Sequence, residues 1–115
     1  MNRAPVDVLV DLYQTLVERK SAAAGKSYVA SLYARGTDVI LKKLGEEAAE
    51  TIIAAKNPDD AALVYELADL WFHSLVLMAS RDIPVGAITT ELARRMGTSG
   101  LEEKAGRMQQ GGQHG

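Results

Sequence analysis

Residues 43–73 read KLGEEAAETIIAAKNPDDAALVYELADLWFH, and this stretch decides the fold. Apolar residues recur at helical spacing on both sides of Pro58, whereas β-branched residues never alternate with polar ones for long. The pattern predicts two helices, over residues 37–56 and 59–81. The connection at residues 56–60 is so short that the two helices are expected to form an antiparallel hairpin.

The remainder of the chain also predicts helices and no strands. Pro5 and Pro84 each precede a helix-like pattern, and proline suits the first position of a helix. The sequence therefore predicts helices over residues 5–21 and 84–97, which makes the fold class all-α, a helical bundle.

The sequence also contains candidate helix caps and one long connection. Thr37 or Asp38 is expected to cap the helix over residues 37–56, and Asp59 the helix that follows it. The glycine-bounded segment 25–36 carries its own apolar residues, so it is either a packed functional loop or a short extra helical turn.

Length and composition restrict the class of protein. The 115 residues predict one domain over residues 1–108, followed by a flexible C-terminal tail over residues 109–115. The net charge of −2 gives no support for a nucleic-acid binder, which would usually show a basic surplus. The absence of cysteine excludes disulfides, zinc–thiolate sites and thiol nucleophiles.

No targeting or membrane segment is expected. Asp7 and Asp11 interrupt the apolar residues near the start, unlike in a signal peptide. The longest apolar run, residues 67–79, is shorter than a membrane span and contains Asp69 and His73. The protein is therefore expected to be cytoplasmic, with neither a membrane nor a nucleic acid as its partner.

Four carboxylates fall at matching heights on the predicted hairpin. Glu50 and Glu66 lie eight residues before and after Pro58. Glu47 and Asp69 lie eleven residues before and after it. At a rise of about 1.5 Å per residue, each pair can meet across the helices, where the charges would repel one another unless neutralised. This arrangement predicts a site for magnesium, which prefers oxygen ligands, although a solvated acidic face is the alternative.

The helix over residues 59–81 is apolar around most of its circumference, which is typical of a buried helix. Carboxylates there need a partner or a metal. His73 is expected either to orient the Asp69 carboxylate by a hydrogen bond or to be a core residue whose ring nitrogens are hydrogen-bonded. The side chains of Trp71, Phe72 and Met78 are expected in the core. Because so few other helices are available to cover this surface, we expect a homodimer or higher homo-oligomer to complete the core.

Several segments resemble the phosphoribosyl-ATP pyrophosphohydrolase family, a branch of the all-α, MazG-like nucleoside-triphosphate pyrophosphohydrolases. The superfamily motif is E-E-x-x-E on one helix followed by E-x-x-D on the next. The resembling segments are residues 27–32 (SYVASL), 43–50 (KLGEEAAE), 66–73 (ELADLWFH) and 96–105 (MGTSGLEEKA). The S-G-L-E-E-K element at residues 99–104 is the most specific to this branch.

The resemblance implies hydrolysis of phosphoribosyl-ATP to phosphoribosyl-AMP and pyrophosphate, the second step of histidine biosynthesis. It implies Mg²⁺ as cofactor, with Mn²⁺ as a substitute, and a separate phosphoribosyl-AMP cyclohydrolase as the next enzyme. The residues that match the metal ligands of the superfamily are Glu47, Glu50, Glu66 and Asp69.

Further roles follow from this chemistry. Glu46, which matches the first acid of the motif, or Glu50 is expected to accept the proton of the attacking water. Cationic side chains are expected to bind the phosphates, with a solvated surface charge as the alternative for each. The candidates are Lys43, Arg35, Arg95, Lys104 and Arg107.

Two other functions stay open. One is a house-cleaning enzyme of the same fold that hydrolyses non-standard or deoxynucleoside triphosphates; the element at residues 99–104 argues against it. The other is a non-catalytic helical dimerisation module, which would need no metal and would tolerate Glu50→Gln. Acidic residues on an otherwise apolar helix argue against such a module, because packing alone would favour apolar residues there.

Overall fold

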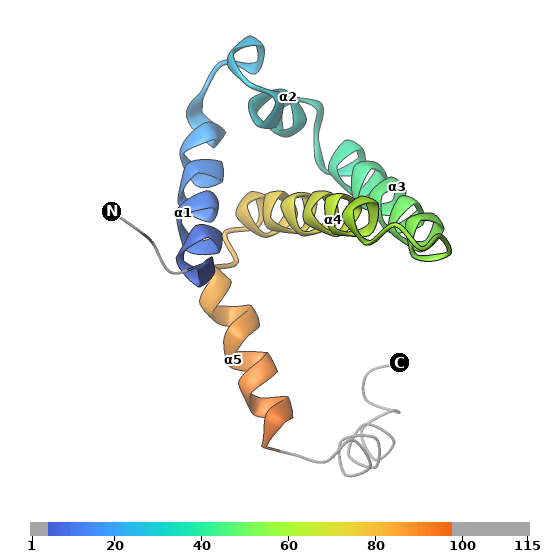
Figure 1. Cartoon of the computed structure of the whole chain (residues 1–115). Helices are drawn as coiled ribbons and strands as arrows, with labels where there is room; N and C mark the ends of the chain where they lie inside the picture. The colour runs from blue at the N-terminus through green and yellow to red at the C-terminus, as the bar shows by residue number, and fades with distance from the viewer. Residues whose placement is uncertain (1–4, 98–115) are drawn as a thin grey trace, which may run out of the picture. The chain divides into compact units, whose positions relative to one another are not determined.

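The computed structural model describes residues 5–97 of the chain, and this part is built from helices without strands (Figure 1). The all-α prediction is therefore confirmed. The α-helices are α1 (Pro5–Glu18), α2 (Tyr28–Arg35), α3 (Thr37–Ala55), α4 (Asp60–Ser80) and α5 (Val85–Met96). Two short 3₁₀ helices, η1 (Arg19–Ser21) and η2 (Ala24–Lys26), lie between α1 and α2. The chain divides into two compact units, with the boundary in the sequence between Val85 and Gly86.

The segment over residues 25–36, for which the sequence allows either a packed loop or an extra helical turn, contains the eight-residue helix α2. The side chain of Ser27 caps it by accepting the N–H of Ala30 at 3.0 Å. Val29 and Leu32 are buried in the core, so α2 is an integral part of the fold.

The expected cap of α4 is confirmed, because the Asp59 side chain accepts the N–H of Ala62 at 3.2 Å. The expected cap of α3 is wrong, since Gly36 holds that position and neither Thr37 nor Asp38 makes a capping hydrogen bond. The physical reason is that one residue both ends α2 and begins α3. Such a tight junction requires φ 101° at Gly36, which favours glycine.

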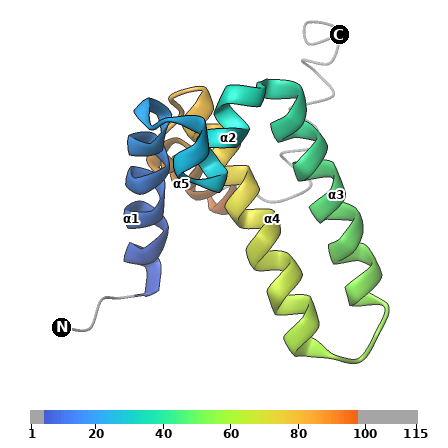
Figure 2. The same ribbon diagram turned by 90° about the horizontal axis from the view of Figure 1, so that it is seen from above.

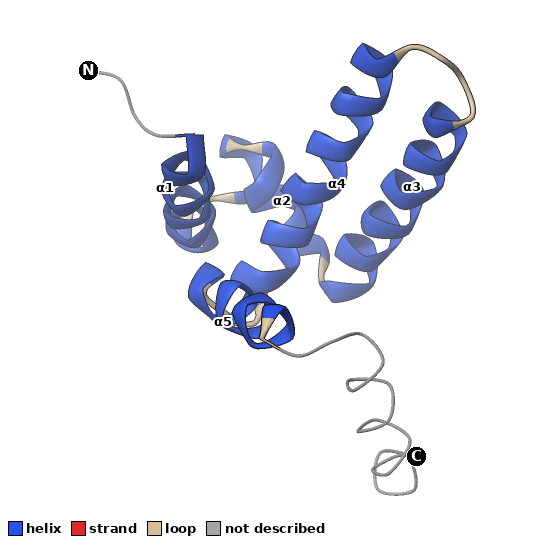
Figure 3. Cartoon of the chain, turned by 60° about the horizontal axis from the view of Figure 1, so that its bottom comes forward, coloured by secondary structure: helices blue, strands red, loops and turns tan. Residues whose placement is uncertain are grey.

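Helices α3 and α4 form the predicted antiparallel hairpin and lie side by side (Figures 2 and 3). The C-terminal half of α4 also packs against α1, and the core of the first unit lies there. Its buried members are Leu16 of α1, Val29 and Leu32 of α2, Ile40 of α3, and Leu75, Val76 and Ala79 of α4. The hairpin end near the turn lies outside this core, which leaves both helices poorly covered there.

Large apolar side chains of the hairpin are correspondingly exposed. They are Leu41, Ile52, Ile53, Val64, Tyr65, Leu67 and Trp71, and we call them the exposed hairpin side chains. Phe72 and Met78 pack against the core as expected. Trp71, expected in the core, is 57% exposed, because no described helix of this chain covers its side of α4.

Helix α4 is also long and apolar enough to cross a membrane, by length and composition alone. Core helices of soluble proteins meet the same criterion. Carboxylates inside a membrane are costly, and α4 carries Glu66 and Asp69 near its middle. These acids favour a helix that is covered by protein.

Candidate active site

The hairpin brings four carboxylates together. Oxygens of Glu47, Glu50 and Glu66 all lie within 4.8 Å of one another, and an oxygen of Glu47 lies within the same distance of ligand atoms of Asp69 and His73. The matched heights predicted from the turn are thus present in the structure, with two acids from α3 and two from α4. We call Glu47, Glu50, Glu66 and Asp69 the carboxylate cluster; their role as metal ligands stays a prediction.

Two oxygens of this cluster are buried without a hydrogen-bond partner among the described residues. They are Oε2 of Glu47 and Oε2 of Glu66. Glu47 is only 5% exposed, although its helix is otherwise largely open to solvent. A buried carboxylate without a partner is strongly destabilising, so native structures keep one mainly where a proton or a cation satisfies it.

The pKa values also show that the charged form of these buried carboxylates is unfavourable. Burial, assisted by the charges of Asp69 and Glu50, raises the pKa of Glu47 to about 7. Burial and the neighbouring Glu50 also raise the pKa of Glu66. Without a cation, Glu47 therefore tends to retain a proton near neutral pH, and a divalent ion would compete with that proton.

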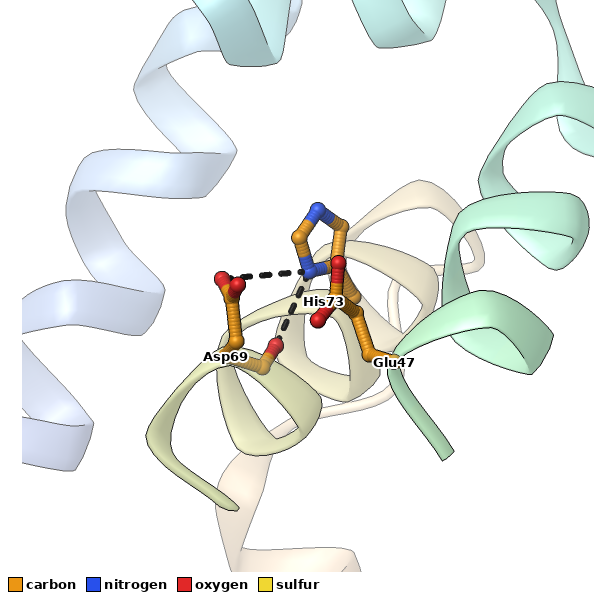
Figure 4. A group of neighbouring side chains, drawn as sticks. All are labelled: Glu47, Asp69 and His73. Carbon is orange, nitrogen blue, oxygen red and sulfur yellow. Dashed lines mark hydrogen bonds and ion pairs between the residues drawn. The ribbon is translucent and has the colours of Figure 1, made fainter. Parts of the chain in front are cut away.

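His73 lies next to two members of the cluster, and Figure 4 shows its ring beside Glu47 and Asp69. Nδ1 lies 2.9 Å from the main-chain oxygen of Asp69 and 3.8 Å from its carboxylate Oδ1. The carbonyl can only accept, so Nδ1 donates to it, and Nε2 then accepts the Tyr28 hydroxyl at 2.8 Å. Both ring nitrogens are engaged, and the donor reaches the main chain of Asp69 instead of its carboxylate.

Lys43 and Glu46 lie together on the neighbouring part of α3. Lys43 Nζ is 3.5 Å from Glu46 Oε2. Tyr28 and, to a smaller extent, Glu46 raise the pKa of Lys43, so this side chain stays protonated and positively charged. Glu46 is exposed and lies outside the two groups of converging ligand atoms, unlike Glu50.

The other predicted cations are placed differently. Arg35 is exposed at the end of α2, where its charge acts on the Tyr28 hydroxyl. Arg95 belongs to the second unit, and its Nε donates to Glu91 at 2.9 Å within α5. Lys104, Arg107 and the element at residues 99–104 lie outside the described residues.

From the sequence alone, Tyr28 is expected to pack in the core, with the lining of a nucleotide pocket as the alternative. The structure leaves it 48% exposed, with its hydroxyl on His73 and within electrostatic reach of Asp69 and Glu47. Burial raises its pKa, so the hydroxyl keeps the proton it donates. The available signal was its position directly after the Ser27 cap, which says nothing about a partner 45 residues away.

Comparison with known proteins identifies the family of the chain. Residues 9–96 match the profile of the family described as phosphoribosyl-ATP pyrophosphohydrolase. The chain is 55% identical over 101 residues to the phosphoribosyl-ATP pyrophosphatase of Ruthia magnifica subsp. Calyptogena magnifica. The aligned region covers 88% of this chain and 96% of that protein. The chain is 56% identical over 102 residues to the phosphoribosyl-ATP pyrophosphatase of Methylococcus capsulatus, with 89% and 97% covered. For Neisseria gonorrhoeae the identity is 50% over 100 residues, with 87% and 94% covered. The chain therefore belongs to the phosphoribosyl-ATP pyrophosphohydrolase family.

Proposed function

We propose that this chain hydrolyses phosphoribosyl-ATP to phosphoribosyl-AMP and pyrophosphate, the second step of histidine biosynthesis, and that it needs Mg²⁺ to do so. The observation that carries the proposal is the carboxylate cluster, in which Glu47 and Glu66 each bury an oxygen that has no hydrogen-bond partner within residues 5–97. Membership of the family supports the substrate.

The residues present fit a hard divalent cation. All four members of the cluster offer oxygen, the ligand atom that Mg²⁺ and Mn²⁺ prefer. The buried Oε2 atoms of Glu47 and Glu66 are available for it because no residue that the structure describes forms a hydrogen bond with them. His73 is not an available ligand, since both its ring nitrogens already have partners.

When bound, the cation would neutralise charge on the triphosphate and lower the pKa of the attacking water. The side chains of the chain supply the remainder. Glu50 lies inside the cluster yet is exposed to solvent, which suits it to accept the proton of that water. Glu46 is engaged with Lys43 and is the weaker candidate. Lys43 and Arg35 are the described cations best placed to bind phosphate oxygens.

We also propose that a second copy of the chain covers the exposed hairpin side chains, giving a homodimer or a larger homo-oligomer. An apolar surface of this kind on two adjacent helices is typical of an interface. A cytoplasmic location and a separate phosphoribosyl-AMP cyclohydrolase, which would consume the product, accompany this proposal.

The experiment that tests the activity is pyrophosphate release from phosphoribosyl-ATP beside a panel of ordinary and deoxynucleoside triphosphates, all with Mg²⁺. We expect release from phosphoribosyl-ATP to exceed release from every other nucleotide. Release only from the other nucleotides would assign the house-cleaning function. A folded protein that acts on none of them would favour the non-catalytic dimerisation module.

A further inference from the structure

Tyr28 reaches the site from a helix that contributes no carboxylate. It is the first residue of α2, and its hydroxyl is 2.8 Å from His73 Nε2 on α4. The hydrogen bond joins residues 45 positions apart in the sequence. It therefore ties the position of α2 to the helix that carries Glu66 and Asp69.

Hydrogen bonds and aromatic contacts fix the position of the His73 ring. It is 3% exposed, with Nδ1 donating to the Asp69 carbonyl and Nε2 accepting from Tyr28. The rings of Phe72 and Tyr28 meet it edge to face, with centroids at 5.2 Å and 5.8 Å. Among the residues that the structure describes, only the Tyr28 hydroxyl satisfies Nε2, so loss of that hydroxyl would leave a buried acceptor without a partner there.

The orientation of this ring matters to the carboxylate beside it. In the present orientation, the N–H at Nδ1 is directed to the main chain of Asp69, and the carboxylate Oδ1 is 3.8 Å away, beyond hydrogen-bond distance. A ring that turned to satisfy Nε2 elsewhere could bring its N–H onto that carboxylate. The N–H would then occupy an oxygen that the cation needs.

We propose that Tyr28 is a positioning residue for Asp69, and that its hydroxyl, acting through His73, keeps the Asp69 carboxylate free to bind the divalent cation. The inference rests on the proposed function, because it assigns Tyr28 to the same metal site. Substitution of a residue that orients a metal ligand, without binding the metal itself, typically lowers metal affinity or activity about 10- to 100-fold.

The test compares Tyr28→Phe with Tyr33→Phe. Each removes one hydroxyl from α2, but the Tyr33 hydroxyl donates at 2.8 Å to the Leu16 carbonyl and not to the site. Binding of Mn²⁺ and Mg²⁺ is measured by calorimetry, and folding is checked by circular dichroism. Tyr28→Phe is expected to weaken metal binding about 10-fold and to lower kcat with little change in KM for the nucleotide. Tyr33→Phe is expected to bind metal like the wild type.

A double-mutant cycle tests the route through His73. If Tyr28 acts only through that ring, Tyr28→Phe will add less than about twofold to the effect of His73→Gln on metal binding. Two effects that multiply would overturn the route. If His73→Gln does not fold, the comparison of Tyr28→Phe with Tyr33→Phe still decides whether the Tyr28 hydroxyl contributes to metal binding.

The outcomes separate this inference from the proposed function. A wild type that binds no divalent cation and releases no pyrophosphate would end the proposed function. A wild type that does both, beside a Tyr28→Phe variant that binds metal as tightly as Tyr33→Phe, would overturn only the role of Tyr28.

Discussion

Glu47 of α3 and Asp69 of α4 face each other across the hairpin, with a carboxylate oxygen of each within 4.8 Å of the other and of a His73 nitrogen. The charge of Asp69 and burial together raise the pKa of Glu47. The protein thus holds like charges at a distance that is unfavourable until a cation or a proton lies between them.

Replacement of Glu47 by Gln should separate stability from function. The substitution removes a buried charge, so we expect the metal-free protein to melt at a higher temperature above about pH 7. It also removes a predicted ligand, so pyrophosphate release should fall about 100-fold or more. Thermal melts and activity assays check both, with Glu18→Gln, an exposed acid at the end of α1, as control. A variant that loses stability and keeps activity would contradict the assignment.

The stability of the metal-free protein should depend on pH in an unusual direction. The pKa of Glu47 rises from 4.5 to about 7 on folding, so between these values the folded state binds more protons than the unfolded state. The free energy of unfolding therefore falls as pH rises through this window. Melting temperatures in a chelator should drop from about pH 5 to about pH 8, and Glu47→Gln should flatten the drop.

Added Mg²⁺ should reverse that loss. The cation replaces protons on the cluster, so it should raise the melting temperature more at about pH 8 than at about pH 5. Equal shifts at both pH values would show that the ion binds elsewhere.

Trp71 should contribute to self-association. Trp71→Glu places a charge among the exposed hairpin side chains, and we expect a shift toward monomer with the helical content unchanged. Light scattering coupled to gel filtration measures the mass. Val17→Glu, at an exposed position on α1, is the matched control. A wild type that is already a monomer at full activity would rule out the proposed interface.

Two glycines should respond oppositely to alanine. Gly36 has φ 101°, so Gly36→Ala should destabilise the protein by about 1–3 kcal/mol although its Cβ would meet nothing within 4 Å. Gly45 lies inside α3 with equally open space, so Gly45→Ala should stabilise the metal-free protein by about 0.5–1 kcal/mol. Denaturant titrations give both values, and the same sign for both would refute the assignment of strain to the junction.

The hairpin and the cluster could be predicted because both depend on local periodicity. Helical spacing on each side of Pro58 sets the two helices, and a short turn converts equal sequence distances into equal heights. The sequence spacing alone therefore predicts that Glu47 lies opposite Asp69.

Long-range packing could not be predicted in the same way. The exposure of Trp71 depends on what the other helices leave uncovered, and the hydrogen bond from Tyr28 to His73 depends on where α2 packs. The Gly36 junction has no local signal in the sequence, because a residue without a side chain holds the position where a capping side chain is expected. Nothing in the local pattern at these positions specifies the partner.

The most direct test of the central claim is pyrophosphate release from phosphoribosyl-ATP by metal-stripped protein, before and after Mg²⁺ is restored, in the wild type and in Glu50→Gln. The carboxylate cluster predicts no release without the ion, full release after its return, and none from the variant in either state. Release that persists without the ion, or that is equal in Glu50→Gln, would contradict the claim that these carboxylates form the active site.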